Sequence, residues 1–234
     1  LADFRVPVLL FSGGEPLLRP DFFELAEHAA AKGVRPTLST NGTLIDRATA
    51  QRIKDIGVGY VGISLDGLKD VNDKFRGKEG AYEAAMRGIE NCTAVGQRVG
   101  LRFTINHHNI MELDKIFDFI EEEGINRVCF YHLVYSGRGN AMMEEDVTAQ
   151  ESRSAMDTII RRTRDFEERG LEKEILTVDN HCDGVYIYLK TLREKGEAAA
   201  EHVWKHISMN GGNRSGIAFG EVDPLGYVHP DQFT

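Results

Sequence analysis

The sequence lacks any pair of closely spaced cysteines. Its three cysteines, Cys92, Cys129 and Cys182, lie far apart and form neither a CxxC nor a CxxxCxxC pattern. An odd number of separated cysteines argues against a disulfide framework and cannot supply the thiolates of a metal cluster. We therefore expect no metal site within this chain and a reducing, cytoplasmic location.

Long apolar runs and an excess of positive charge are also missing. No apolar stretch approaches the roughly 20 residues that a membrane-spanning helix needs. The formal net charge of −9 offers no basic surface for nucleic acid or anionic lipid. No GxGxxG motif follows the first hydrophobic run, so a dinucleotide-binding fold has little support. We expect neither a nucleic-acid partner nor a membrane partner.

Hydrophobic runs instead alternate with amphipathic stretches along most of the chain. The pattern predicts strands at residues 6–11, 34–40, 57–65, 99–105 and 127–134 and helices at 22–32, from 46 onward, and at 82–95, 112–123 and 148–170. Short connections between the two kinds of segment favour right-handed βαβ units and a parallel sheet. The predicted fold class is therefore α/β, as a barrel or a partial barrel.

Polar and glycine-rich residues follow the predicted strands at their carboxyl ends, the edge where α/β sheets bind ligands. The first strand ends at residues 12–16, where Gly13 and Gly14 expose the backbone and Glu15 lies beside free carbonyl groups. A carboxylate in that place suits a ligand ammonium. The alternative is an ordinary strand-to-helix turn with a solvated glutamate.

Three segments at these strand ends, SGGEPLL (12–18), TNGT (40–43) and SLDG (64–67), resemble in order and spacing the motifs of radical S-adenosylmethionine (radical SAM) enzymes. The resemblance covers residues 6 to about 140 and implies a partial (β/α) barrel. It also implies the cofactors S-adenosylmethionine (SAM) and a [4Fe–4S] cluster held by a CxxxCxxC loop. We expect that loop and the first strand upstream of Leu1, and we expect the fragment alone to be inactive. Loss of the cluster is the alternative.

The resemblance also implies roles for individual residues in binding SAM. Gly13, Gly14, Glu15 and Pro16 would hold the methionyl amino group, Ser64 and Arg102 the carboxylate or ribose, and Asp66 the ribose edge, with Asn41 in the same site. An arginine on an inward strand position is costly to bury unpaired, so a carboxylate partner is physically sensible. The alternative for Arg102 is a salt bridge to Asp66 or Glu15.

The carboxyl-terminal part of the chain narrows the family resemblance. We assign residues 1–170 to the barrel and 171–234 to a truncated extension, because GIAFGEVDPLGYVHPDQF (216–233) resembles a SPASM or twitch extension. Asn210 and the pair Asp231-Gln232 stand where that extension usually has cysteines. In this respect the chain resembles the radical SAM enzymes of haem d1 and alternative haem biosynthesis. The enzymes of this tetrapyrrole branch remove side chains from didecarboxysirohaem. An auxiliary cluster would lie beyond Thr234.

The resulting hypothesis is an enzyme that modifies a tetrapyrrole by 5′-deoxyadenosyl radical chemistry, with a reductase, flavodoxin or ferredoxin as electron donor. Arg138, Arg214 and His107 are the candidate substrate residues, since glycines beside both arginines let a ligand approach and a histidine can ligate iron. Solvated loop arginines and a structural histidine are the alternatives. Two other functions remain open: a peptide-modifying maturase of the pyrroloquinoline quinone or mycofactocin type, and a non-catalytic binding paralogue.

Overall fold

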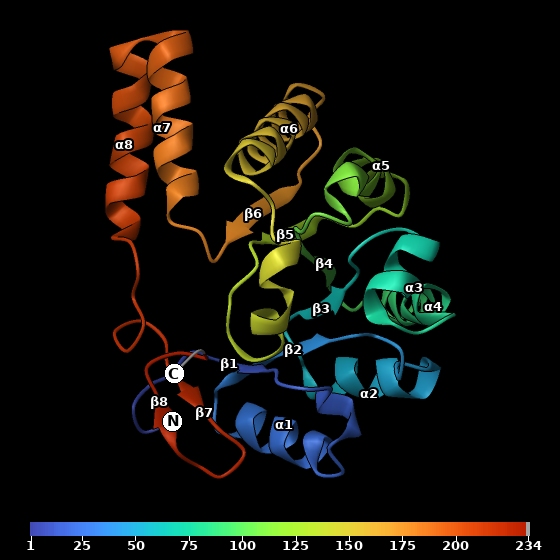
Figure 1. The fold of residues 1–234 in the computed structure, drawn as a ribbon. Coiled ribbons are helices and arrows are strands. Elements are labelled where there is room, and N and C mark those ends of the chain that lie inside the picture. The colour runs from blue at the N-terminus through green and yellow to red at the C-terminus, as the bar shows by residue number, and fades with distance from the viewer. Residues whose placement is uncertain (233–234) are drawn as a thin grey trace.

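The computed structural model describes residues 1–232, apart from the side chains of Arg138 and Asn210, and shows one large sheet wrapped by helices (Figure 1). The strands are β1 (Val8–Phe11), β2 (Arg35–Thr40), β3 (Val61–Ser64), β4 (Val99–Thr104), β5 (Arg127–Tyr131) and β6 (Glu174–Val178). They lie side by side in chain order, and every neighbouring pair is parallel. The sheet curls into half of a (β/α) barrel, which confirms the predicted fold class.

Helices connect the successive strands and cover the outer face of the sheet (Figure 1). They are α1 (Phe22–Ala31), α2 (Arg47–Ile56), α3 (Asp70–Arg76), α4 (Ala81–Ala94), α5 (Leu113–Glu122) and α6 (Ala149–Glu168). Two of them begin and end as their residues dictate. Asp46 caps α2 by accepting from the amide of Thr49, and Gly57 ends it in the left-handed conformation. Helix α6 begins with a capping box between Thr148 and Glu151.

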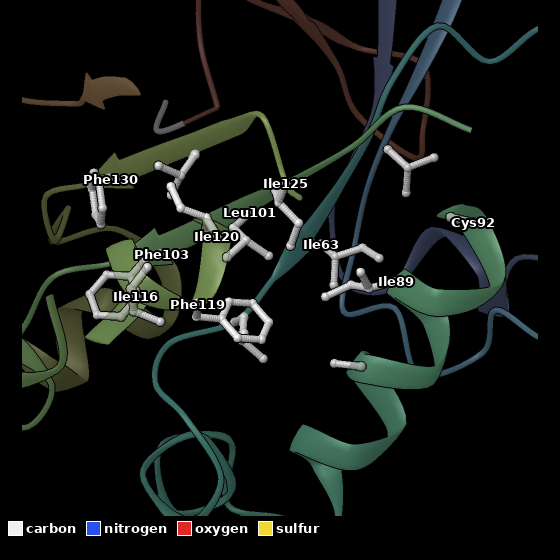
Figure 2. Close-up of a cluster of buried hydrophobic side chains, with 14 of the residues drawn as sticks. Ile63, Ile89, Cys92, Leu101, Phe103, Ile116, Phe119, Ile120, Ile125 and Phe130 are labelled. Carbon is white, nitrogen blue, oxygen red and sulfur yellow. The ribbon is translucent and has the colours of Figure 1, made fainter. Parts of the chain in front are cut away.

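The hydrophobic core lies between the outer face of the sheet and these helices (Figure 2). Alternate strand residues point to opposite faces, and the outer set, such as Ile63, Leu101 and Phe103, is fully buried. These side chains meet residues of α4 and α5: Ile89, Cys92, Ile116, Phe119 and Ile120. Cys92 is therefore a packed apolar residue, as its position on a predicted helix indicates.

The concave face of the sheet carries small and polar residues instead of a core. Gly62 is the cross-strand partner of Gly100, and Ser64 is the partner of Arg102. A Cβ atom on Gly100 would lie 2.4 Å from the hydroxyl oxygen of Tyr60. One on Gly62 would lie 2.9 Å from Cδ of Arg102. The two glycines thus leave room for Tyr60 and Arg102 to lie against the sheet.

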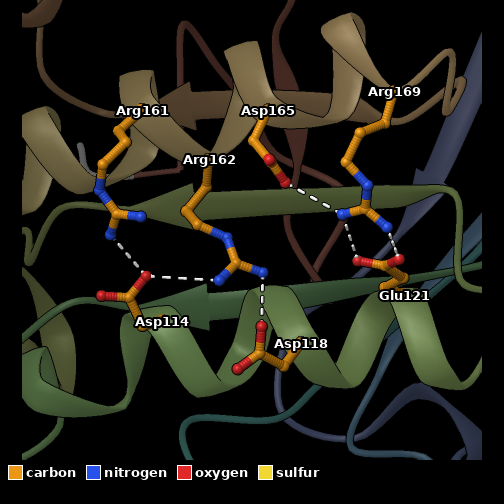
Figure 3. A network of polar contacts seen from close by, with 7 residues as sticks. All are labelled: Asp114, Asp118, Glu121, Arg161, Arg162, Asp165 and Arg169. Carbon is orange, nitrogen blue, oxygen red and sulfur yellow. Dashed lines mark hydrogen bonds and ion pairs between the residues drawn. The ribbon is translucent and has the colours of Figure 1, made fainter.

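Ion pairs fasten α6 to α5 across the outer surface (Figure 3). Arg162 lies 2.6 Å from Asp118 and 3.6 Å from Asp114, and Arg169, directly after the last residue of α6, contacts Glu121. Single exposed pairs contribute little to stability, but a network of several holds the two helices in one register. The network fixes α6 beside α5, and α6 leads into β6.

The carboxyl-terminal part of the chain differs from the expected division of the chain in one place. β6 belongs to the six-stranded sheet, so the sheet extends beyond the expected boundary at residues 170/171. Helices α7 (Cys182–Lys195) and α8 (Glu197–Asn210) then form a hairpin that projects from the barrel, followed by the small strands β7 (Glu221–Val222) and β8 (Val228–His229). No helix in the described part of the chain combines the length and the apolar composition of a membrane span.

Candidate functional site

The turn after β1 is tied to the turn after β2 through Glu15. One carboxylate oxygen of Glu15 accepts from the hydroxyl of Thr40 at 2.7 Å and from the amide of Leu17 at 3.1 Å. The other oxygen accepts from the amide of Asn41 at 2.7 Å. A carboxylate has about four acceptor positions, so three of those of Glu15 are used within the chain. Glu15 therefore mainly holds the two turns together, and its carboxylate has little remaining hydrogen-bonding capacity for a ligand ammonium.

The glycines before Glu15 are better placed to receive an ammonium group. Gly13 adopts a φ of 114°, and a Cβ atom on either Gly13 or Gly14 would meet nothing within 4 Å, so open space lies beside both. No hydrogen bond among the described residues uses the carbonyl oxygen of either glycine. Pro16 then begins a short 3₁₀ helix, Pro16–Leu18, which fixes where the exposed turn ends.

Arg102 provides a positive charge at the same edge of the sheet. Its guanidinium lies 4.4 Å from the ring centre of Tyr131, and no carboxylate of the described residues pairs with it. The expected alternatives, ion pairs of Arg102 with Asp66 or Glu15, are not formed. Ser64 lies beside Arg102 across the sheet. A partly buried cation without a partner fits a ligand carboxylate.

Asp66, unlike Gly13 and Gly14, is not exposed at this edge of the sheet. Its side chain is 1% exposed, forms an ion pair with Arg76 of α3, and accepts from the amide of Thr104 at 2.7 Å. Burial raises the pKa of the Asp66 carboxyl, while Arg76 and the Thr104 amide oppose that shift. Asp66 therefore joins α3 to β4. The ribose contact expected of Asp66 would require its pair with Arg76 to open.

The expected substrate residues fall in three separate segments, which follow β4, β5 and α8. The imidazole of His107 lies 3.0 Å from the carboxylate of Glu151 in the capping box of α6, which gives it a structural partner. Arg214 is exposed in the loop between α8 and β7. The side chain of Arg138 lies outside the described part of the structure. The structure thus leaves the roles of these residues in substrate binding as predictions.

Sequence reasoning missed a buried polar cluster at the ends of β5 and β6. Nε2 of His132 lies 2.9 Å from a carboxylate oxygen of Asp183, and both residues are buried. Nδ1 of His132 lies 3.4 Å from the side-chain nitrogen of Asn180. A histidine directly after a buried strand was the signal available in the sequence, but its partners lie about 50 residues further along the chain.

The cysteines do not form a cluster site. Cys92 and Cys129 are buried, Cys182 is exposed, and none is in a disulfide. Within residues 1–232 no group of three or more histidine, cysteine, aspartate or glutamate side chains is arranged to hold a metal ion. The described residues fit the amino acid end of SAM, but they do not fit a [4Fe–4S] cluster.

A separate hollow lies at the opposite end of the strands. Its volume is about 570 Å³, and its lining includes Tyr60, Arg98 and Arg127, which lie near the amino ends of β3, β4 and β5. The hydroxyl of Tyr60 is buried there without a hydrogen-bond partner, and burial raises its pKa to about 12. This end of an α/β barrel generally serves stability, so we place the functional site at the carboxyl end.

Comparison with known proteins gives three findings. Residues 1–120 match the family model described as the radical SAM superfamily. The chain is 57% identical over 233 residues to the Fe-coproporphyrin III synthase of Methanosarcina barkeri and 43% identical over 234 residues to the pre-heme d1 synthase of Dinoroseobacter shibae. Both alignments cover 100% of this chain and 58% of the relative. This chain therefore spans about 58% of the length of these curated relatives.

A solved structure supports the fold independently. The crystal structure of Streptococcus suis SuiB bound to S-adenosylmethionine matches with a TM-score of 0.68 at 18% identity, covering 95% of this chain and 48% of that one. At this identity the similarity shows the fold alone. It agrees with the half-barrel seen here.

Proposed function

Because this chain belongs to the radical SAM superfamily, we propose that the whole protein is an enzyme that uses SAM to remove side chains from an iron tetrapyrrole. Members of the family bind SAM and a [4Fe–4S] cluster. When bound, SAM supplies the 5′-deoxyadenosyl radical that abstracts hydrogen from the substrate. The tetrapyrrole part of the proposal rests on similarity to proteins named Fe-coproporphyrin III synthase and pre-heme d1 synthase.

The residues of this chain bind and orient the cofactor in this proposal. The free carbonyl groups of Gly13 and Gly14 accept from the methionyl ammonium, while Glu15 holds that turn against β2. Arg102, with Ser64 beside it, pairs with the methionyl carboxylate. The unpaired guanidinium of Arg102 on the concave face is the observation that carries the cofactor assignment. Pre-formed charges of this kind orient a ligand without reorganisation.

The substrate residues complete the proposal. A tetrapyrrole presents several carboxylates around a flat apolar ring, so its site needs cationic groups at the rim. Arg138 and Arg214 are proposed for that rim, with His107 as a further contact, and a reductase, flavodoxin or ferredoxin would supply the electron. Residues 171–234 would form the SPASM-like part of the site.

An anaerobic assay of the reconstituted full-length protein tests this function. The protein is incubated with SAM, a reductant and didecarboxysirohaem, and the tetrapyrrole is analysed by mass spectrometry. The proposal requires formation of 5′-deoxyadenosine together with a tetrapyrrole that has lost a carboxylate-bearing side chain. An unchanged tetrapyrrole with modification of a peptide would replace this function by the maturase alternative. Failure to cleave SAM at all would favour a non-catalytic binding paralogue.

A further inference from the structure

His132, at the end of β5, fastens the loop that follows β6 on both sides of Asp179. The amide of His132 donates to the carbonyl of Val178 at 3.1 Å, one residue before Asp179. On the other side, the His132 ring lies 3.4 Å from the Asn180 side chain and 2.9 Å from the carboxylate of Asp183. His132 and Asp183 are 9% and 4% exposed. A buried histidine thus holds both flanks of a single loop residue.

Asp179 adopts a conformation that side chains rarely take. Its φ is +69°, in the left-handed region, which is sparsely populated by residues other than glycine, asparagine and aspartate. Such conformations persist where surrounding contacts determine them, and they concentrate at functional sites. The contacts of His132 are those that determine this one.

The Asp179 carboxylate is left free for a ligand. None of the hydrogen bonds or ion pairs of the described residues involves its side chain, which remains accessible to solvent. Desolvation raises the pKa of this carboxyl, while the charges of Arg102, His132 and His181 oppose the shift. Burial raises the pKa of Tyr131, with a smaller contribution from the charge of Asp179, and Tyr131 lies between β4 and β6 in the sheet. Arg102 and Asp179 therefore flank Tyr131.

The order of strands separates this carboxylate from the proposed cofactor contacts. The groups assigned to SAM follow β1 and lie on β3 and β4, whereas Asp179 follows β6 at the far side of the same edge. A second molecule bound beside SAM would meet the ends of β5 and β6. Among the described residues, the Asp179 carboxylate at that place forms no hydrogen bond or ion pair, so it can contact a ligand there.

We propose that Asp179 contacts the substrate by sharing a proton with one of its carboxyl groups, and that His132 is the positioning residue that presents Asp179. This inference rests on the proposed tetrapyrrole function and assigns one of its substrate contacts. Two carboxyl groups in one site bind a single proton between them when both are close together.

Optical titration of the reconstituted full-length protein with didecarboxysirohaem tests the proposal. Asp179→Gly removes the carboxyl without penalty for the left-handed backbone, and we expect the affinity at pH 7 to fall about tenfold or more. Asp179→Asn keeps a hydrogen-bond donor, so it should retain the affinity for the tetrapyrrole. The affinity of the wild type should fall as pH rises, whereas that of Asp179→Asn should not. Asp55→Asn, at an exposed position of helix α2, is the matched control and leaves both quantities unchanged.

The positioning role of His132 is tested by a double-mutant cycle. His132→Phe should weaken tetrapyrrole binding like Asp179→Gly, and the double variant should be no weaker than either single one, with SAM affinity unchanged. Additive losses, or a loss of SAM affinity, would reduce His132 to a structural role. His132→Gln, whose amide can still donate to Asp183, should retain most of the wild-type affinity, and a loss in it as large as that of His132→Phe would contradict the role of this contact.

The outcomes separate this inference from the proposed function. A wild type that binds no didecarboxysirohaem removes the proposed function and the inference together. A wild type that binds it, with Asp179→Gly binding equally well at every pH, removes the inference alone.

Discussion

The carboxylate of Glu15 accepts a 2.7 Å hydrogen bond from the backbone amide of Asn41, so the glycine turn after β1 is joined directly to the turn after β2. The same carboxylate accepts from Thr40 and Leu17. Glu15, which the sequence predicts to be a ligand-binding residue, therefore has a structural role. It holds Gly13 and Gly14 in the position where their carbonyl groups face open space.

Replacement of Glu15 should cost stability as well as cofactor affinity. Glu15→Ala leaves the amide of Asn41 and the hydroxyl of Thr40 without their acceptor, which should lower the free energy of unfolding by about 1–3 kcal/mol. Glu15→Gln retains one oxygen and should cost less. Urea denaturation measures both. An unchanged midpoint in Glu15→Ala would mean that these hydrogen bonds contribute nothing to the fold.

Arg102 should affect cofactor binding with little effect on the fold. Arg102→Ala in the full-length protein should weaken SAM binding about tenfold or more, because a charge-assisted contact is lost. Arg102→Lys should recover part of it, since lysine keeps the charge but not the planar fork. Arg98→Ala, just before the amino end of β4 and exposed, is the matched control. Equal SAM affinity in all four proteins would reject the assignment of Arg102.

Much of the fold and part of the site could be predicted from local sequence. Apolar runs alternating with amphipathic stretches predicted the parallel sheet, because βαβ connection leaves few other arrangements. The neighbouring positions of Ser64 and Arg102 follow from strand alternation once β3 and β4 are adjacent. The glycines after β1 indicate an exposed turn by residue type alone.

The remaining features depend on contacts between residues that lie far apart in the sequence. Asp66 follows a strand like the other site residues, yet it forms an ion pair with Arg76 of α3, a helix that is not among those predicted from the sequence. His132 pairs with Asp183, 51 residues away. A lone histidine and a lone aspartate carry no mark of that pairing in the sequence. Asp179 becomes notable only through its left-handed backbone.

The three thiols should differ sharply in reactivity. Burial raises the pKa of Cys92 to about 11, and Cys129 is also buried, whereas Cys182 is exposed. Because the thiolate is the reactive form, iodoacetamide should label Cys182 first in the folded chain and all three only after denaturation. Peptide mass spectrometry identifies the labelled site. Early labelling of Cys92 would contradict its place in the core.

Stability should fall at alkaline pH because of Tyr60. Its pKa is raised to about 12 in the folded state, compared with about 10 in an unfolded chain. Between these values the unfolded state loses the proton first, so unfolding becomes easier as pH rises. Tyr60→Phe should remove about 1–2 kcal/mol of this fall. It should be neutral or slightly stabilising at pH 7, where the Tyr60 hydroxyl lacks a partner.

The matched control for Tyr60 is Tyr227→Phe, which changes an exposed tyrosine. It should leave the pH dependence of the unfolding free energy unaltered. If Tyr60→Phe and Tyr227→Phe lose stability in parallel with the wild type between pH 10 and 12, burial of the Tyr60 hydroxyl is not the cause.

A crystal structure of the reconstituted full-length protein with SAM tests the central claim most directly, because that claim is about where the cofactor lies. We expect the methionyl ammonium within hydrogen-bond distance of the Gly13 and Gly14 carbonyl oxygens and the methionyl carboxylate against Arg102. Glu15 should still accept from Asn41. SAM bound at the opposite end of the strands, or bound at the carboxyl end with Arg102 turned away from it, would contradict the account.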